Sequence, residues 1–163
     1  MSVEPHWLST REWGKAVGVG VATAVILAVL NVIALKTQVS PMPKPLGLAF
    51  AETVFNHSLP LPVGLLFHLA WVTFFSVVYV VLRRNALTLL NAVILASILW
   101  LLVLVVFFPV VGWGFLGLAV TPKLIVPATV SHLLFAVILW GLCRLAFGQS
   151  VEPGHSQPHA RTA

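Results

Sequence analysis

The chain has 163 residues, of which 60% are hydrophobic and 8% are charged, and its mean hydropathy is +1.04. A soluble domain needs more charge to cover its surface, so most of the chain must lie in lipid. At about 20 residues per span there is room for four spans and for no separate soluble domain. Nine Lys and Arg residues against four acids are spread over both ends and the loops, which favours the positive-inside pattern over nucleic-acid binding.

The first apolar run covers residues 16–35, after a polar segment at 1–15, and it ends at Lys36. A basic flank precedes the run, as in a secretory signal peptide. No small-x-small cleavage site closes it, however. We therefore predict a retained first transmembrane helix, with residues 1–15 as a cytoplasmic segment.

Three further apolar runs predict spans at about 61–82, 86–108 and 124–147, which makes the domain 16–147 an all-α bundle of four transmembrane helices. The runs end at Arg83-Arg84, at Pro109 and at Gly148. The proline-rich loop after the first span contains the short apolar stretch 46–55. This stretch is too short to span, so we predict short interfacial helices in the outer loops. The polar tail 148–163 is predicted to be disordered.

The basic residues predict the orientation in the membrane. Six lie on one side of the predicted spans and three on the other, and cytoplasmic loops carry the excess of Lys and Arg. Both termini are therefore expected in the cytoplasm. The two groups are Arg11, Lys15, Arg83, Arg84, Arg144 and Arg161, and on the other side Lys36, Lys44 and Lys123.

The two halves of the chain share short sequence matches in the same order. These are 24–28 with 92–96, 46–49 with 116–119, and 68–69 with 132–133. Loop insertions explain the drift in their offsets. We therefore predict two duplicated two-helix units, related by a pseudo-twofold axis along the membrane normal.

Small residues at a spacing of four occur in the first and third spans. They are Gly20, Ala24 and Ala28, and Ala92 and Ala96. Such spacing lets helix backbones approach closely in lipid. The sequence therefore predicts that the first span packs against the third near the axis.

His68 and His132 each lie about eight residues from the outer end of a span, or about 12 Å inside it at the rise of a helix. An ionisable residue inside a span is a functional-site candidate. We expect both rings to point into the bundle and to hydrogen bond a neighbouring helix or loop. Three roles stay open: structural hydrogen bonding, handling of protons or substrate, and ligation of haem or a metal.

Two further residues are candidates for ligand or proton handling. Tyr79 follows His68 by eleven residues and so shares its helix face; it either extends a polar stripe or anchors the helix at the interface. Glu52 is the one acid between the two ends of the membrane domain.

The spans contain no carboxylate, which argues against an ion-coupled carrier. No serine has a carboxylate–histidine context, which argues against a hydrolase.

The run Phe108-Pro109-Val110-Val111-Gly112-Trp113-Gly114-Phe115-Leu116-Gly117-Leu118, followed by a span with His132, resembles a pattern in small bacterial four-span inner-membrane proteins of unknown function. A helix with His68 and Tyr79 precedes it, and the layout is similar to that of YagU-like proteins. This family often has glycine about four positions after each histidine, where this chain has Val72 and Ala136.

The resemblance implies a multi-pass protein of the bacterial inner membrane and no established reaction. We expect a non-enzymatic accessory protein linked to envelope stress. Its expected protein partners are further copies of itself or a subunit of a membrane complex. The alternatives are a redox or ligand-binding subunit that uses His68 and His132 for haem or a metal, and a small passive channel formed on oligomerisation.

Overall fold

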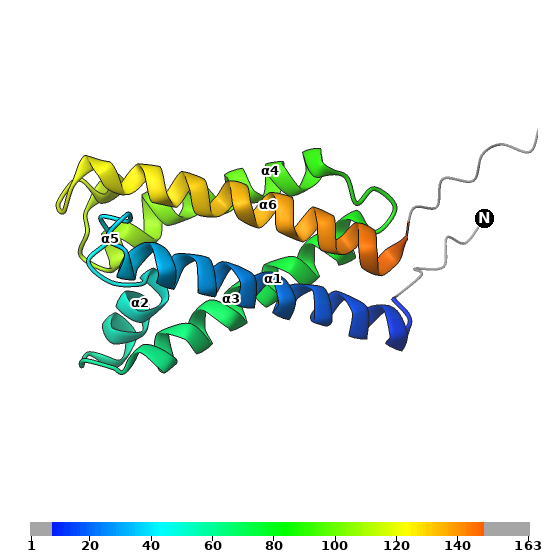
Figure 1. The fold of residues 1–163 in the computed structure, drawn as a ribbon, viewed down its shortest axis with the longest axis horizontal. Coiled ribbons are helices and arrows are strands. Elements are labelled where there is room, and N and C mark those ends of the chain that lie inside the picture. The colour runs from blue at the N-terminus through cyan, green and yellow to red at the C-terminus, as the bar shows by residue number, and fades with distance from the viewer. Residues whose placement is uncertain (1–7, 149–163) are drawn as a thin grey trace, which may run out of the picture.

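A computed structural model describes residues 8–148, and all elements in this part of the chain are helices (Figure 1). Four stretches are long and apolar enough to cross a membrane: Thr10–Lys36, Leu61–Arg83, Leu89–Val110 and Pro122–Phe147. The elements are α1 (Thr10–Lys36), α2 (Leu46–Phe55), α3 (Leu61–Arg83), α4 (Leu89–Leu102), the π-helix η1 (Val103–Phe107), α5 (Phe108–Val110), the 3-10 turns η2 (Phe115–Gly117) and η3 (Pro122–Leu124), and α6 (Ile125–Phe147).

The prediction of four apolar helices long enough to span a membrane is confirmed, and the largest difference in a boundary is at the start of the first. We predicted a first span from residue 16, but α1 begins at Thr10. Ser9 and Glu12 form a capping box there, in which each side chain bonds the backbone N–H of the other residue. The helix therefore starts one and a half turns before the apolar run. Residues 1–7 and the predicted disordered tail from 149 onward lie outside the described residues.

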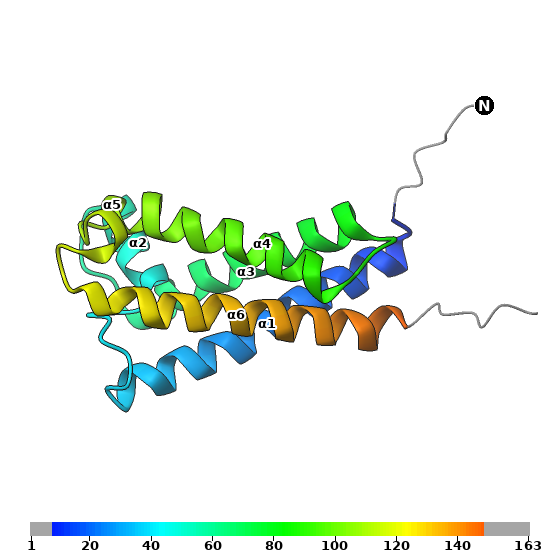
Figure 2. The same ribbon diagram turned by 90° about the horizontal axis from the view of Figure 1, so that it is seen from above.

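Helix α1 lies against α3 and α6, and α6 in turn lies against α4 (Figures 1 and 2). The expected close packing of the first span against the third is not seen, because α1 packs chiefly against α3 and α6. Gly20 shows where the small residues of α1 are used: a Cβ there would lie 3.0 Å from the Cα of Thr73 on α3. The small residues permit a close approach, but the partner helix is α3.

The third span is not a regular α-helix throughout. After α4, residues Val103–Phe107 form a π-helical segment, and the Phe108 N–H bonds the Val103 carbonyl. Pro109 follows immediately; it has no N–H and its ring excludes a carbonyl four residues earlier. The wider π turn accommodates this, so the helix continues to Val110 and does not stop before Pro109 as predicted.

The first outer loop contains the predicted short helix, α2, which packs against the start of α3. Two glycines meet at this contact: a Cβ on Gly64 would lie 2.5 Å from the Cβ of Leu48, and one on Gly47 would lie 2.6 Å from the Gly64 carbonyl oxygen. The second outer loop has only the short turns η2 and η3. Leu116 there has a φ of 56°, so the segments 46–49 and 116–119 have different backbone conformations.

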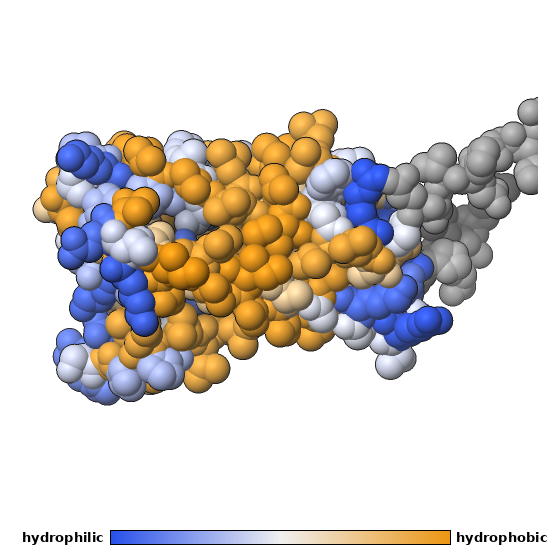
Figure 3. All heavy atoms as spheres, viewed as in Figure 1, coloured by the Kyte–Doolittle hydropathy of each residue, from blue (hydrophilic) through white to orange (hydrophobic). Residues whose placement is uncertain are grey.

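The surface carries an apolar band between two polar ends (Figure 3). Helix α1 begins and α6 ends at the same end of the bundle (Figure 1). Two polar contacts join helices there: Arg84 pairs with Glu12 over 2.7 Å, and Lys15 Nζ donates to the Ala146 carbonyl oxygen over 2.7 Å. The band and its polar ends are the surface expected of a multi-pass membrane protein.

Candidate functional site

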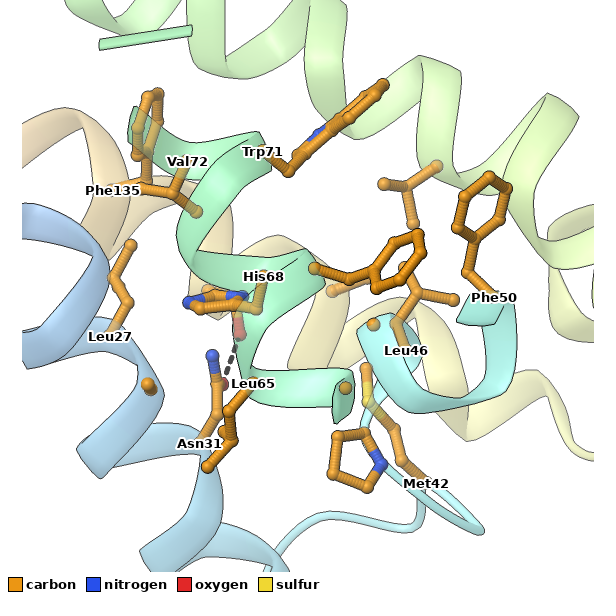
Figure 4. A pocket seen from close by; sticks show the side chains of 18 of the residues that line it. Leu27, Asn31, Met42, Leu46, Phe50, Leu65, His68, Trp71, Val72 and Phe135 are labelled. Carbon is orange, nitrogen blue, oxygen red and sulfur yellow. Dashed lines mark hydrogen bonds between the residues drawn. The ribbon is translucent and has the colours of Figure 1, made fainter. Parts of the chain in front are cut away.

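A cavity of about 190 Å³ lies in the half of the bundle that carries α2 (Figure 4). Its walls come from α1, the loop before α2, α2 itself, α3, the third span and α6. It separates two packed cores. One core, around Tyr79 and Leu139, fills the end with the termini; the other, around Phe108 and Leu124, lies under the outer loops. The cavity is therefore a gap in packing where the two cores meet.

His68 and His132 both line this cavity, from α3 and α6 respectively. The imidazole of His68 lies near the backbone of Ala24 on α1. Its Nε2 atom is buried and has no hydrogen-bond partner in the described structure. In a neutral ring, Nε2 accepts a hydrogen bond when the proton is on Nδ1 and donates one when it carries the proton itself.

His132 has a hydrogen bond at one nitrogen. Its Nδ1 lies 2.7 Å from the carbonyl oxygen of Ala128, one turn earlier in α6. The ring thus bonds its own helix, and the expectation of a bond to a neighbouring helix or loop is wrong for this residue. A carbonyl oxygen only accepts, so the proton of a neutral His132 is on Nδ1 and Nε2 is an acceptor.

A polar pair from two helices completes the hydrophilic part of the lining. Ser131 Oγ on α6 donates to Asn31 Oδ1 on α1 over 2.9 Å, the bond drawn as a dashed line in Figure 4. Asn31 and His68 project from α1 and α3 into the same part of the cavity (Figure 4). Among the described residues that line the cavity there is no Asp, Glu, Lys or Arg, so its polar groups are uncharged acceptors and donors.

Aromatic side chains form the wall between α2, α3 and η1. Trp71 lies with its ring centroid 4.9 Å from that of Phe107 and 4.8 Å from that of Phe75. Phe50 of α2 contacts Phe107 at 5.1 Å and Phe67 at 6.0 Å. Trp71 is 39% exposed and also lines the cavity, so its side chain stands between the cavity and the outer surface.

The other two predicted candidates lie away from the cavity. Tyr79 is buried in the core at the other end, and its hydroxyl donates to the Thr88 carbonyl oxygen over 2.9 Å. It therefore holds the start of α4 from inside the bundle and is not an anchor exposed at the interface. Glu52 accepts hydrogen bonds from Lys44 Nζ at 2.6 Å and from the Leu59 N–H at 3.2 Å. The Lys44 bond, and then the Leu59 bond, hold the pKa of the Glu52 carboxyl below its ordinary value.

The five small residues of the predicted packing motif fall into two groups. Ala24, Ala92 and Ala96 are buried in the core that includes Tyr79, and Gly20 contacts α3. Ala28 differs, because it is only half-buried and lines the cavity. Its small side chain therefore leaves space open and does not join two helices.

Sequence reasoning did not assign Ser131 or the aromatic wall to the site. One signal could have shown the wall: Phe67, Trp71 and Phe75 recur every four residues, beside His68 and Val72 on the same helix.

Few of the described side chains near the cavity could serve as metal ligands. The described residues contain no group of three or more His, Cys, Asp or Glu side chains that could hold a metal ion.

No protein-family model, no curated protein and no solved structure matches this chain. The cavity and its two histidines therefore carry the functional argument by themselves.

Proposed function

We propose that this protein binds a small, uncharged, lipid-soluble molecule in the cavity lined by His68 and His132. The observation that supports this most directly is the buried Nε2 of His68, which has no partner in the described structure. A buried polar atom without a hydrogen bond is costly. A ligand that bonds this atom would remove that cost, and the apolar remainder of the lining would take up the rest of the ligand.

The cavity volume supports a ligand with one ring-sized head. An apolar cavity of about 150 Å³ in another protein is known to take up benzene, and the cavity here has about 190 Å³. A head of one substituted ring matches this space, whereas a porphyrin, with four pyrrole rings in one plane, exceeds it. The volume thus favours a small-molecule site over the haem site considered from the sequence.

A metal ion is the second candidate, because His132 directs Nδ1 to a backbone carbonyl and His68 has a buried, unpartnered Nε2 in the same cavity of the described structure. A histidine that binds a metal through one ring nitrogen usually bonds a carbonyl or carboxylate through the other. An absorbance spectrum together with metal analysis of the purified protein decides between the two. We expect a colourless, metal-free protein; stoichiometric metal lost in both His68→Ala and His132→Ala would favour the second candidate.

The wider setting of this function is also a proposal. We place the protein in a bacterial inner membrane with both termini in the cytoplasm, as the distribution of basic residues and the likeness to YagU-like proteins suggest. The internal duplication, the accessory role in envelope stress, the partner subunits and the oligomeric channel stay predictions from the sequence. A reporter fused after Gly148 tests the orientation, and activity of that reporter only in the periplasm would contradict it.

A cavity-filling substitution tests the binding function. Benzene serves as the probe, and the readout is the thermal stability of the detergent-purified protein, which rises when a ligand binds only the folded state. Ala28→Phe places a ring inside the cavity. Val29→Phe adds the same ring at the next position, which is 52% exposed on the outside of α1, and controls for effects of benzene on the micelle.

We expect benzene to raise Tm in the native protein and in Val29→Phe, and not in Ala28→Phe. Val32→Phe, a second filling variant from the same helix, replaces Ala28→Phe where that variant does not fold. Equal Tm shifts in the native protein and in the filled variants would contradict the proposed function.

A further inference from the structure

We propose that the ligand of this cavity is a phenol-type lipid: a single ring that carries a hydroxyl group and an apolar tail, bound with its hydroxyl on Nε2 of His68. This inference rests on the proposed function and adds the chemical class of the ligand. Three features of the lining select that class: its lack of charge, its hydrogen-bond acceptors and its aromatic wall.

The head of the ligand must be uncharged. No Asp, Glu, Lys or Arg is found among the described lining residues. A phosphate, carboxylate or ammonium head would thus be buried without a counter-charge, which costs far more than burying a hydroxyl group. Phospholipids and fatty-acid anions are disfavoured on this ground.

The head must also donate a hydrogen bond. A neutral His132 keeps its proton on Nδ1, where the Ala128 carbonyl oxygen accepts over 2.7 Å, so its Nε2 has a lone pair. We assign the same tautomer to His68, whose Nε2 is buried without a partner in the described structure. A hydroxyl group satisfies such an acceptor, whereas the oxygen of a ketone or an ether, which only accepts, does not.

The aromatic wall favours a flat ring over a straight chain. Phe50, Trp71 and Phe107 all line the cavity, and the ring centroid of Phe107 lies 5.1 Å from that of Phe50 and 4.9 Å from that of Trp71. Aromatic rings add favourable edge and offset contacts to a ring that lies against them, beyond the burial of apolar area. A single ring also suits the volume of about 190 Å³.

The tail leaves the cavity beside Trp71. This side chain lines the cavity and is 39% exposed, and its ring contacts Phe107 of η1. A tail that passes it reaches the lipid directly. Reduced isoprenoid quinones have this combination of ring hydroxyls and an apolar tail, and other phenolic lipids share it.

Two matched probes test the ligand class. 4-Hexylphenol and 4-hexylanisole have the same ring and tail, but the methyl ether of the anisole cannot donate a hydrogen bond. Quenching of tryptophan fluorescence, or the Tm shift, gives the affinity of each probe for the purified native protein, for His68→Phe and for His57→Phe. His57 lies in an exposed loop outside the cavity and is the matched control.

We expect the native protein and His57→Phe to bind the phenol about three- to tenfold more tightly than the ether, the range of one net hydrogen bond. His68→Phe should bind both probes equally. Equal affinities in the native protein would overturn the assignment of a phenol-type ligand, while a benzene response would leave the proposed binding function standing. Absence of both responses would overturn the function itself.

Competition then identifies the source of the ligand. Ubiquinol-1 carries ring hydroxyls, and its oxidised form, ubiquinone-1, carries only acceptors. Displacement of 4-hexylphenol by ubiquinol-1 and not by ubiquinone-1 would assign the site to reduced quinones. Failure of both to displace a bound phenol would assign it to another phenolic lipid, and displacement by ubiquinone-1 alone would contradict the donor requirement.

Discussion

Ser131 Oγ on α6 donates a hydrogen bond to Asn31 Oδ1 on α1 over 2.9 Å, at the wall of the cavity. The two residues are 100 positions apart in the chain. The bond therefore joins the first and last spans directly. It also gives the Asn31 carbonyl oxygen a partner in the cavity wall, whereas the buried Nε2 of His68 has none in the described structure.

Breaking this bond should loosen the contact between α1 and α6. We expect Ser131→Ala to destabilise the protein, and a double-mutant cycle with Asn31→Ala to give a coupling free energy of roughly 0.5–2 kcal/mol, as for other hydrogen bonds between membrane helices. Unfolding in mixed detergent micelles measures it. Ser97→Ala, on an exposed position of α4, is the control and should change little. A coupling indistinguishable from zero would contradict a structural role for the pair.

Ala96 and Ala28 should respond differently to enlargement, although both belong to the same small-residue pattern. Ala96 is 3% exposed in the core, so Ala96→Leu should overpack it and cost about 1–3 kcal/mol. Ala28 borders the cavity, so Ala28→Leu has space and should leave Tm unchanged. Thermal unfolding in detergent compares the two. A similar loss of stability in both variants would show that the space beside Ala28 is absent.

Gly64 should be required for the contact between α2 and α3. A Cβ there would lie 2.6 Å from the Leu48 Cα, a backbone atom that cannot move without shifting α2. We expect Gly64→Ala to cost about 1–3 kcal/mol. Gly18→Ala is the matched control, because no atom outside its own helix lies within 4 Å of the added Cβ; it should stabilise α1 by about 0.5–1 kcal/mol. Equal effects in the two variants would refute the close contact.

Glu52 should make the stability of the outer loop depend on acid pH. Its pKa is lowered from 4.5, first by the Lys44 hydrogen bond and then by the Leu59 N–H, with a smaller effect of His57. The folded state therefore favours the charged carboxylate. The stabilisation is present above pH 4.5 and is lost as the pH falls through the lower pKa of the folded state.

Glu52→Gln should remove this dependence. We expect the variant to be less stable than the native protein at pH 7, and the difference to shrink as the pH falls below 4.5. Thermal scans from pH 7 down to about pH 3, below the ordinary range of a Glu pKa, measure it. Lys44→Met should behave similarly, since it removes the other partner. A difference that stays constant over this range would contradict the ion pair as its source.

The sequence predicted the helices because a long apolar run has few alternatives in a membrane. It also indicated the two histidines, since an imidazole inside a span needs a polar partner. It did not predict which helix the small residues contact. Their spacing shows which face of α1 carries them, but not which helix packs against that face. Gly20 meets Thr73 of α3 and not the matched alanines of α4.

The cavity itself could not be predicted from the sequence. Its walls combine residues from six elements. In an apolar helix, the sequence does not distinguish an aromatic residue that lines a cavity, such as Phe50 or Trp71, from one that faces lipid. The π turn at Val103–Phe107 depends on how the helix accommodates Pro109, which periodicity does not show. Two residues of this turn, Val103 and Phe107, line the cavity.

The nitrogen resonances of His68 test the central claim most directly. The protein is labelled with 15N only at histidine and titrated in micelles with 4-hexylphenol, and the His68 signals are assigned by their loss in His68→Phe. Before the probe is added, we expect one protonated nitrogen and one free acceptor, the Nδ1–H tautomer of the proposal. The acceptor resonance should then move saturably, as Nε2 accepts a hydrogen bond from the hydroxyl group, and should stay unchanged in Ala28→Phe. An Nε2 resonance that does not respond to saturating 4-hexylphenol would contradict a ligand site at this cavity.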